Sequence, residues 1–389
     1  MTTKPALPDP VTDSAALNER SMARLDALYE RLTAQRKVSI GYPCNHQFDF
    51  APLYRFMEFA VNNLGDPFSG SNFLMNTHDF EREVIMTFAR LTGIGGDDCW
   101  GYVTNGGTEG NMYGLYLARE IYPDGIVYFS EDTHYSVSKI LRLQHTRNIM
   151  IRSSPTGEMD YRDLEESIRI HRDVPPIVFA NVGTTMTGAI DRLDRIREVL
   201  ERQCTPNAYI HVDAAFSGMI LPFVDDPPPW HFGAGADSIS ISGHKLIGSP
   251  LPCGVAMVRK THMERISRSV EYVGALDTTI SGSRNAITPL MLWYALRFHG
   301  DDGFRELVGE SLRKAAYAEK ALNEIGVEAW RNPCSVTVVF PRPPAAVLDK
   351  WVLAGSGDIA HLITLPGIPW ETLDEFVEDM QREKTEVVK

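Results

Sequence analysis

The chain has 389 residues, of which 43% are hydrophobic and 23% charged, a composition typical of a globular enzyme with a large core. Its 38 basic and 51 acidic side chains give a net charge of -13 with no block of basic residues, which excludes the electrostatic signature of a nucleic-acid-binding protein and disfavours an anionic membrane surface. Because no apolar stretch reaches the roughly 18 residues of a membrane span and the N-terminus lacks an apolar signal core, we predict a cytoplasmic protein.

The N-terminal part, residues 1–60, is predicted to be a loose arm followed by a helix. The arm is rich in Pro, Asp and Thr, and a polar helical pattern covers residues 17–35. The sequence Gly41-Tyr42-Pro43 then stops the helix.

Residues 61–285 alternate between helical patterns and short apolar runs. Helices are predicted over residues 80–91, 109–121, 136–143, 161–172 and 194–203, and strands over residues 100–103, 126–129, 148–152, 177–181, 209–212, 238–242 and 254–258. This alternation predicts an α/β domain with a mostly parallel central sheet flanked by helices, which collects ligands at the carboxyl ends of its strands.

The pattern changes after residue 285. Two long helices are predicted over residues 290–298 and 304–324, and shorter elements over residues 335–340, 359–365 and 370–382. We therefore predict a smaller C-terminal α+β domain at residues 286–389.

A glycine turn follows the predicted strand at residues 100–103 and opens a helix. Gly106 and Gly107 let the backbone approach a ligand closely, the first N–H groups of the helix point toward any anion there, and Thr108 adds a hydroxyl. An ordinary capped helix after a tight turn has the same pattern. The segment is neither a Walker loop nor a dinucleotide-binding fingerprint.

Asp213 and Lys245 are the sharpest chemical signal. Asp213 lies in an apolar run, where a carboxylate needs a partner, and a protonated pyridine nitrogen is a fitting one. Ala215, on the same side of the strand, is small enough for a ring to lie against it. Lys245 lies among apolar and small residues, which lower the pKa of its amine as a Schiff base requires. The pair predicts a pyridoxal phosphate (PLP) site.

Two further strand ends carry candidate residues. His134 follows the predicted strand at 126–129 and can stack on a planar cofactor, although a single loop histidine is more often structural. Thr184 and Thr185 follow the strand at 177–181 and can reach the cofactor's phenolic oxygen or a substrate carboxylate.

A metal-dependent hydrolase is the remote alternative. His211 and Asp213 would be ligands, with His134 or His244 completing the site. This interpretation leaves Lys245 and the glycine turn without a role. The five cysteines are scattered, odd in number and without a Cys-x-x-Cys motif, which favours reduced thiols and argues against a zinc site.

From about residue 41 to residue 365 the chain resembles the group II PLP-dependent amino-acid decarboxylases, most closely the bacterial histidine decarboxylases and their plant serine decarboxylase relatives. Six segments carry the resemblance in order: residues 105–111 (NGGTEGN), 132–136 (DTHYS), 179–185 (FANVGTT), 212–215 (VDAA), 242–245 (SGHK) and 280–285 (ISGSRN). The resemblance implies a fold-type I enzyme that binds pyridoxal 5′-phosphate and a small amino-acid substrate, and works as a homodimer with its sites at the subunit interface.

The resemblance also implies residue roles. Lys245 would form the Schiff base, Asp213 would pair with the ring nitrogen, and His134 would stack over the ring. The remaining cofactor contacts would come from phosphate-binding residues, a residue under the ring and a threonine near the carboxylate or phenolic oxygen: Gly106, Gly107, Thr108, Ser242, His244, Ala215 and Thr184 or Thr185. Residues 272–285 resemble a mobile loop over the site, and Tyr272 and His134 are candidate proton donors.

The implied reaction is decarboxylation of an L-amino acid to an amine and CO₂. Alternatives are an oxygen-using decarboxylase-deaminase on the same scaffold and a non-catalytic PLP-binding protein. The chain departs from the histidine enzymes at the rim of the site, where Gly-His is replaced by Ala286-Ile287 and a loop histidine by Leu276. We therefore hypothesise that the substrate pocket is more apolar than in the histidine enzymes and favours another amino acid. Its candidate residues are Phe68, Phe73, Tyr272, Leu276 and Ile287.

Overall fold

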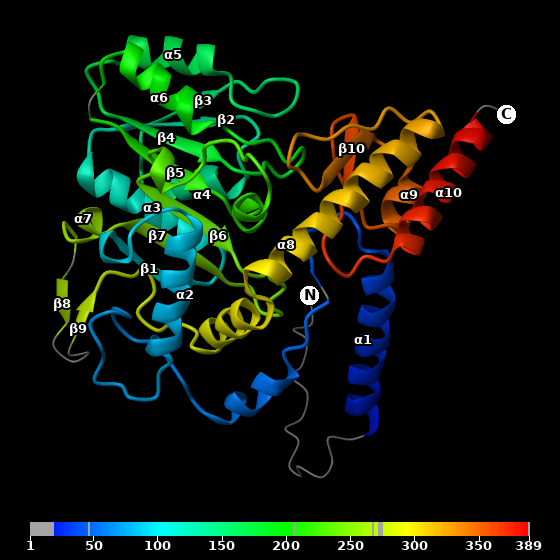
Figure 1. Cartoon of the computed structure of the whole chain (residues 1–389), viewed down its shortest axis with the longest axis horizontal. Helices are drawn as coiled ribbons and strands as arrows, with labels where there is room; N and C mark the ends of the chain where they lie inside the picture. The colour runs from blue at the N-terminus through cyan, green and yellow to red at the C-terminus, as the bar shows by residue number, and fades with distance from the viewer. Residues whose placement is uncertain (1–18, 46, 206, 267, 271–274, 388–389) are drawn as a thin grey trace, which may run out of the picture.

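The computed structural model describes residues 19–45, 47–205, 207–266, 268–270 and 275–387. Its centre is a seven-stranded sheet of order β1-β7-β6-β5-β4-β2-β3 (Figure 1). The strands are β1 (Cys99–Thr104), β2 (Ile126–Ser130), β3 (Asn148–Ile151), β4 (Pro176–Asn181), β5 (Tyr209–Asp213), β6 (Ser238–Ser242) and β7 (Gly254–Arg259). β7 is antiparallel to both of its neighbours, whereas β3, β2, β4, β5 and β6 pair in parallel. The prediction of a mostly parallel sheet is confirmed.

Helices cover both faces of this sheet, because its strands are apolar on both sides. Along β4, Val178 and Ala180 belong to one core cluster, while Ile177 and Phe179 belong to the other. α3, α4 and the short α7 contribute side chains to the second cluster, whereas α2, α5 and α6 contribute to the first. The helices are α2 (His78–Leu91), α3 (Gly107–Ile121), α4 (Ser136–Leu143), α5 (Tyr161–Ile170), α6 (Leu193–Arg202) and the short α7 (Lys260–Met263).

A smaller C-terminal unit packs beside the large one. Its three-stranded antiparallel sheet has the order β10-β12-β11. Its elements are β10 (Thr337–Pro341), α9 (Ala345–Lys350), β11 (Ala354–Ser356), β12 (Ile359–Ile363) and α10 (Trp370–Val387). The prediction of a smaller C-terminal unit of helices and strands is confirmed.

The long α8 (Ile287–Glu324) runs diagonally from the large unit to the small one (Figure 1). Gly300 interrupts it with a φ of 58°, which a residue with a side chain adopts only under strain. Leu290 and Leu292, before the break, pack into the main core, whereas Ala315 and Leu322 pack into the core of the small unit. The change of core therefore occurs within α8, and the predicted boundary at residue 285 stays a prediction.

The remaining described elements are short. They are the 3-10 helices η2 (Ala51–Glu58), η3 (Gly96–Asp98), η4 (Ser217–Met219), η5 (Leu221–Phe223) and η6 (Phe232–Ala234), and the hairpin of β8 (Arg268–Val270) and β9 (Ala275–Asp277). β9 lies within residues 272–285, which were predicted to be a mobile loop, and β8 precedes them.

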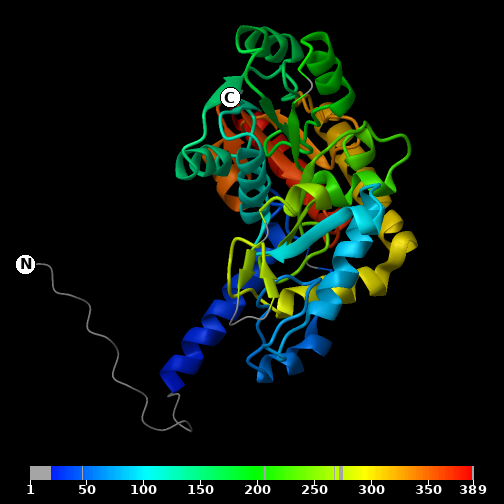
Figure 2. The ribbon, with the colours of Figure 1, turned by 90° about the vertical axis from the view of Figure 1, so that its left-hand side faces the viewer.

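The N-terminal helix α1 (Glu19–Val38) stands away from the rest of the chain in both views (Figures 1 and 2). One stripe of large apolar side chains along it is exposed: Met22, Leu25, Leu28, Tyr29 and Leu32. The predicted arm before it lies outside the described residues. Within the described part of the chain, no helix combines the length and the apolar character that crossing a membrane needs.

Candidate active site

A cavity of about 270 Å³ lies at the carboxyl ends of the central strands. All ten of the predicted cofactor residues line it: Gly106, Gly107, Thr108, His134, Thr184, Asp213, Ala215, Ser242, His244 and Lys245. Thr185 and Asn111 line it as well. The loops after β1, β2, β4, β5 and β6 therefore meet at one point.

The glycine turn forms one end of the cavity. Gly106 has a φ of 129°, a conformation that favours glycine, and it precedes the first turn of α3. A Cβ atom on Gly107 would lie 3.1 Å from both the Ala215 Cβ and the Ser242 Oγ, so this space admits only a glycine comfortably. No side chain caps the start of α3, which leaves its first N–H groups free to bind an anion. This end fits a phosphate group.

Glu109 holds the turn in place from inside the first turn of α3. Its carboxylate accepts hydrogen bonds from the backbone N and the Nδ2 of Asn105, at 2.9 and 2.8 Å. The Tyr102 hydroxyl donates to the same carboxylate at 3.1 Å. These contacts fix the backbone that faces the cavity, and sequence reasoning gave Glu109 no role.

Lys245, a half-buried residue, supplies an amine to the same cavity. Burial lowers its pKa, and attraction to Asp213 opposes part of this shift. The Nζ atom lies 5.6 Å from the centre of the Phe216 ring. A lysine whose charged form is disfavoured can act as a nucleophile toward an aldehyde.

Two donors orient the carboxylate of Asp213. Asn111 Nδ2 donates to Oδ2 at 2.7 Å, and the backbone N of Ala215 donates to Oδ1 at 3.0 Å. Each oxygen keeps a lone pair for a ligand in the cavity. A carboxylate held in this way fits a protonated ring nitrogen. Asn111 lies inside a segment that carried the family resemblance, but a contact across 102 positions of sequence leaves no local signal.

His134 is held in one orientation by Ser136. The Ser136 backbone N–H donates to His134 Nδ1 at 3.3 Å, and the Ser136 hydroxyl lies 2.8 Å from the same atom. The pKa of His134 is lowered, mainly by burial, so its ring is neutral. Because Nδ1 accepts a hydrogen bond, the single ring proton is assigned to Nε2.

His211, a ligand in the metal-site alternative, forms hydrogen bonds within the protein. His211 is buried, with its Nδ1 2.7 Å from the Ser238 hydroxyl and its Nε2 3.0 Å from Asn111 Oδ1. Across the described ranges, no group of three or more His, Cys, Asp or Glu side chains is arranged to hold a metal ion. Both ring nitrogens of His211 thus serve hydrogen bonds inside the protein.

Of the predicted substrate-pocket residues whose side chains the structure describes, Phe68, Phe73 and Ile287 do not line this cavity. Phe68 is 38% exposed and lies beside Asp79 and Arg82 of α2. Phe73 is half-buried, and Ile287 packs against the main core at the start of α8. The backbone of Leu276 pairs with Ser269 in the β8–β9 hairpin, and Tyr272 lies outside the described residues. Their role in substrate recognition stays a prediction.

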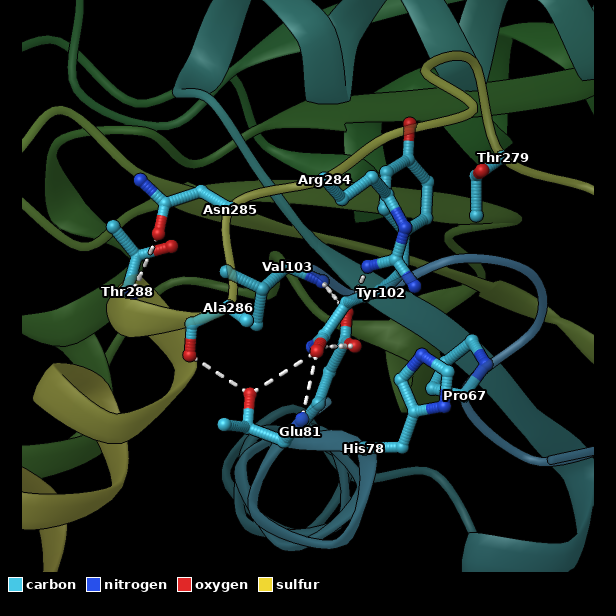
Figure 3. A network of polar contacts seen from close by, with 12 residues as sticks. Pro67, His78, Glu81, Tyr102, Val103, Thr279, Arg284, Asn285, Ala286 and Thr288 are labelled. Atoms are coloured by element: carbon cyan, nitrogen blue, oxygen red, sulfur yellow. Dashed lines mark hydrogen bonds and ion pairs between the residues drawn. The ribbon is translucent and has the colours of Figure 1, made fainter. Parts of the chain in front are cut away.

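A buried ion pair between Arg284 and Glu81 anchors the segment that leads from the β8–β9 hairpin to α8 (Figure 3). Both side chains are almost fully buried. Glu81 also accepts from Asn63 Nδ2 at 2.7 Å and from the backbone N of Val103 at 2.8 Å. Arg284 donates to the Gly65 carbonyl at 2.9 Å. The pair therefore joins α2, β1 and the segment before α8.

This anchor reaches the phosphate end of the cavity through Tyr102. The Arg284 guanidinium lies 5.3 Å from the centre of the Tyr102 ring (Figure 3). The Tyr102 hydroxyl in turn donates a hydrogen bond to Glu109. Thr77 adds a bond from its hydroxyl to the Ala286 carbonyl at 2.8 Å. Sequence reasoning recognised Arg284 only as part of a motif, because its partner lies 203 residues away.

Comparison with known proteins decides the family. The model of the pyridoxal-dependent decarboxylase conserved domain matches residues 101–340, more than half of the chain. The chain belongs to this family. This decarboxylase is 50% identical to the histidine decarboxylase of Pseudomonas entomophila over 352 residues, which cover 90% of this chain and 87% of the relative. It is 47% identical to the histidine decarboxylase of Morganella morganii, with 92% and 95% covered.

Solved structures agree with this assignment. L-methionine decarboxylase from Streptomyces sp. 590 superposes on the decarboxylase with a TM-score of 0.86 at 28% identity, with 98% of this chain and 97% of that chain covered. The enzyme is therefore a PLP-dependent amino-acid decarboxylase of the histidine decarboxylase-like type, as predicted. The predicted cofactor, pyridoxal 5′-phosphate, is confirmed by the family.

Proposed function

We propose that Lys245 holds pyridoxal 5′-phosphate in the described cavity and that the enzyme decarboxylates an L-amino acid with an apolar side chain. The observation that carries the first part is the placement of Lys245 and the oriented carboxylate of Asp213 around one cavity with the glycine turn at its end. When bound, this cofactor supplies a protonated ring that takes up the electron pair left on the α-carbon when the carboxylate bond breaks.

The side chains around the cavity divide the work. Lys245 supplies an amine with a lowered pKa, and the start of α3 with Thr108 binds the phosphate. Asp213 holds the proton at the ring nitrogen. His134 presents a neutral ring whose orientation Ser136 fixes. These roles, and the cytoplasmic location predicted from the sequence, are part of the proposal.

The proposal of an apolar substrate rests on residues at the rim of the site that differ from those of the histidine enzymes. A site that binds an imidazole needs polar side chains as hydrogen-bond partners. Their loss lowers the selectivity between substrates far more than the gain or loss of one methylene group in an apolar pocket does. In this chain Ala286 and Ile287 occupy the positions where the histidine enzymes typically carry Gly-His. The identity of 50% to a histidine decarboxylase favours histidine as the second candidate.

A panel of amino acids separates these candidates. We expect kcat/KM for an aliphatic or thioether amino acid to exceed that for histidine by about tenfold or more. Replacing Ile287 with histidine should shift the ratio toward histidine, whereas the Ile170→His control, an exposed isoleucine on α5, should not. A wild-type enzyme with histidine as its best substrate by a wide margin would contradict the apolar assignment.

We further propose a homodimer whose sites lie at the subunit interface. Supporting this, the α1 stripe leaves Leu25, Tyr29 and Leu32 exposed, which favours burial against another surface. Tyr54, Met57 and Phe59 around η2 are exposed as well. Phe68 and Ile287 do not line the cavity of their own chain, so the proposed role of both residues in substrate binding calls for the cavity of a second copy.

A mixed-dimer experiment tests this arrangement. Lys245→Ala and Phe68→Asp subunits are expected to be inactive separately, and co-expression should restore about a quarter of the wild-type sites, since half of the dimers are mixed and each has one intact site. The control is Phe298→Asp, which changes a more exposed phenylalanine on α8 and should stay active by itself. Tagged mixed dimers without activity, or a monomer in sedimentation, would contradict the proposal.

A further inference from the structure

Behind Asp213 lies a row of three buried polar side chains. Ser238 on β6 contacts His211 on β5 at 2.7 Å, His211 contacts Asn111 on α3 at 3.0 Å, and Asn111 contacts Asp213 at 2.7 Å. Ser238, His211 and Asn111 are at most 2% exposed. The row leads from Ser238, the first residue of the inner strand β6, to Asp213, which lines the cavity together with Lys245.

Hydrogen-bond chemistry fixes the direction of every bond in this row. An ionised Asp213 only accepts, so Asn111 donates through Nδ2 and its Oδ1 is left to accept. His211 Nε2 must then carry a proton and donate to Oδ1. Burial lowers the pKa of His211 to about 3, so its ring is neutral and Nδ1 accepts from the Ser238 hydroxyl. Each donor thus meets an acceptor, and the row adds no charge beside Asp213.

The fold makes specific room for this imidazole. A Cβ atom on Gly114 of α3 would lie 2.1 Å from His211 Nδ1, so α3 packs against the ring only because this residue is glycine. The ring of Phe179 covers the imidazole from β4, with 5.1 Å between ring centres. Contacts with α3 and with Phe179 of β4 therefore fix the position of His211 next to Asn111.

We propose that Asn111 and His211 are positioning residues for the cofactor's ring nitrogen: they fix the rotation of the Asp213 carboxylate and so strengthen its bond to that nitrogen. This inference rests on the proposed function, which places the ring nitrogen at Asp213. With Oδ1 held by the Ala215 backbone and Oδ2 by Asn111, the carboxylate cannot turn without losing a bond. A freely turning carboxylate would meet the ring nitrogen only part of the time.

The test compares two ligands that differ only at the ring nitrogen. These are pyridoxal 5′-phosphate and its analogue in which C–H replaces the ring nitrogen, each titrated into apoenzyme to obtain a dissociation constant. The measured quantity is the dissociation constant of the analogue divided by that of pyridoxal 5′-phosphate. This ratio isolates the bond to Asp213, because the phosphate and lysine contacts are the same for both ligands. We expect the ratio to fall about tenfold in Asn111→Leu and in His211→Phe.

Two further variants separate positioning from general damage to the fold. His211→Gln keeps a donor toward Asn111 and should retain most of the wild-type ratio. Tyr113→Phe changes a buried residue two positions after Asn111 on α3 and should leave the ratio unchanged. If His211→Phe does not fold, Asn111→Leu still decides the question.

The outcomes distinguish the inference from the proposed function. A ratio equal to that of wild type in Asn111→Leu, with both ligands bound, would overturn the inference alone. A wild-type enzyme that binds both ligands equally well would overturn the pairing of Asp213 with the ring nitrogen, and with it the inference. A ratio that falls in Asn111→Leu and recovers in His211→Gln would support it.

Discussion

Replacing Lys245 with alanine is expected to lower kcat for amino-acid decarboxylation by about a thousandfold or more, because this variant lacks the amine that holds the cofactor. Lys245 is the lysine that lines the cavity with Asp213, and its burial already lowers the pKa of its amine. The measurement is CO₂ release at saturating substrate and cofactor, together with the visible absorbance of the purified protein.

A matched control keeps this test specific. Lys320→Ala removes an exposed lysine of α8 that pairs with Glu324 on the surface, and it should keep wild-type activity and absorbance. Circular dichroism should show that both variants are folded. A Lys245→Ala enzyme with a tenth or more of wild-type kcat would contradict the role of Lys245.

The second large effect concerns stability. Glu81→Ala is expected to lower the free energy of unfolding by about 3–5 kcal/mol, because it leaves the buried guanidinium of Arg284 without its partner. The backbone N of Val103 and the amide of Asn63 lose their acceptor as well. The measurement is equilibrium unfolding in urea, with cofactor present at one fixed concentration.

An exposed ion pair on the same helix serves as the control. Glu83→Ala, also on α2, removes an ion pair to Arg297 in which both side chains are about half exposed or more, and it should cost at most about 1 kcal/mol. The double variant Glu81→Gln, Arg284→Met should be more stable than Glu81→Ala, since no unpaired charge stays buried. A loss under about 1 kcal/mol in Glu81→Ala would show that water or another group replaces the carboxylate.

Local patterns in the sequence were enough to predict most elements of the fold. The helix predicted at residues 136–143 is found as Ser136–Leu143, and the strands lie within one or two residues of their predicted ends. The exception to the predicted parallel order is β7, which runs antiparallel to its neighbours, because the hydrophobic pattern of a single strand does not encode its direction. The two predicted helices at 290–298 and 304–324 are one α8 interrupted at Gly300.

The gathering of the candidate cofactor residues around one cavity was predictable for a similar reason. Each of them lies at the end of a strand or shortly after it, and these strand ends meet at one edge of the sheet. The role of Asn111 and His211 in holding Asp213 was not recognised from the sequence, because their contacts depend on how α3 packs against β5. The substrate pocket stays a prediction, and Phe68 and Ile287 do not line the cavity of their own chain.

Trapping the cofactor on the protein tests the central claim most directly. Reducing the purified holoenzyme with borohydride makes the bond between the cofactor aldehyde and its lysine permanent, and digestion with mass spectrometry then identifies the modified peptide. The account predicts one pyridoxyl group per subunit, on Lys245. A label on another lysine, or a fully active enzyme that takes up no label, would contradict it.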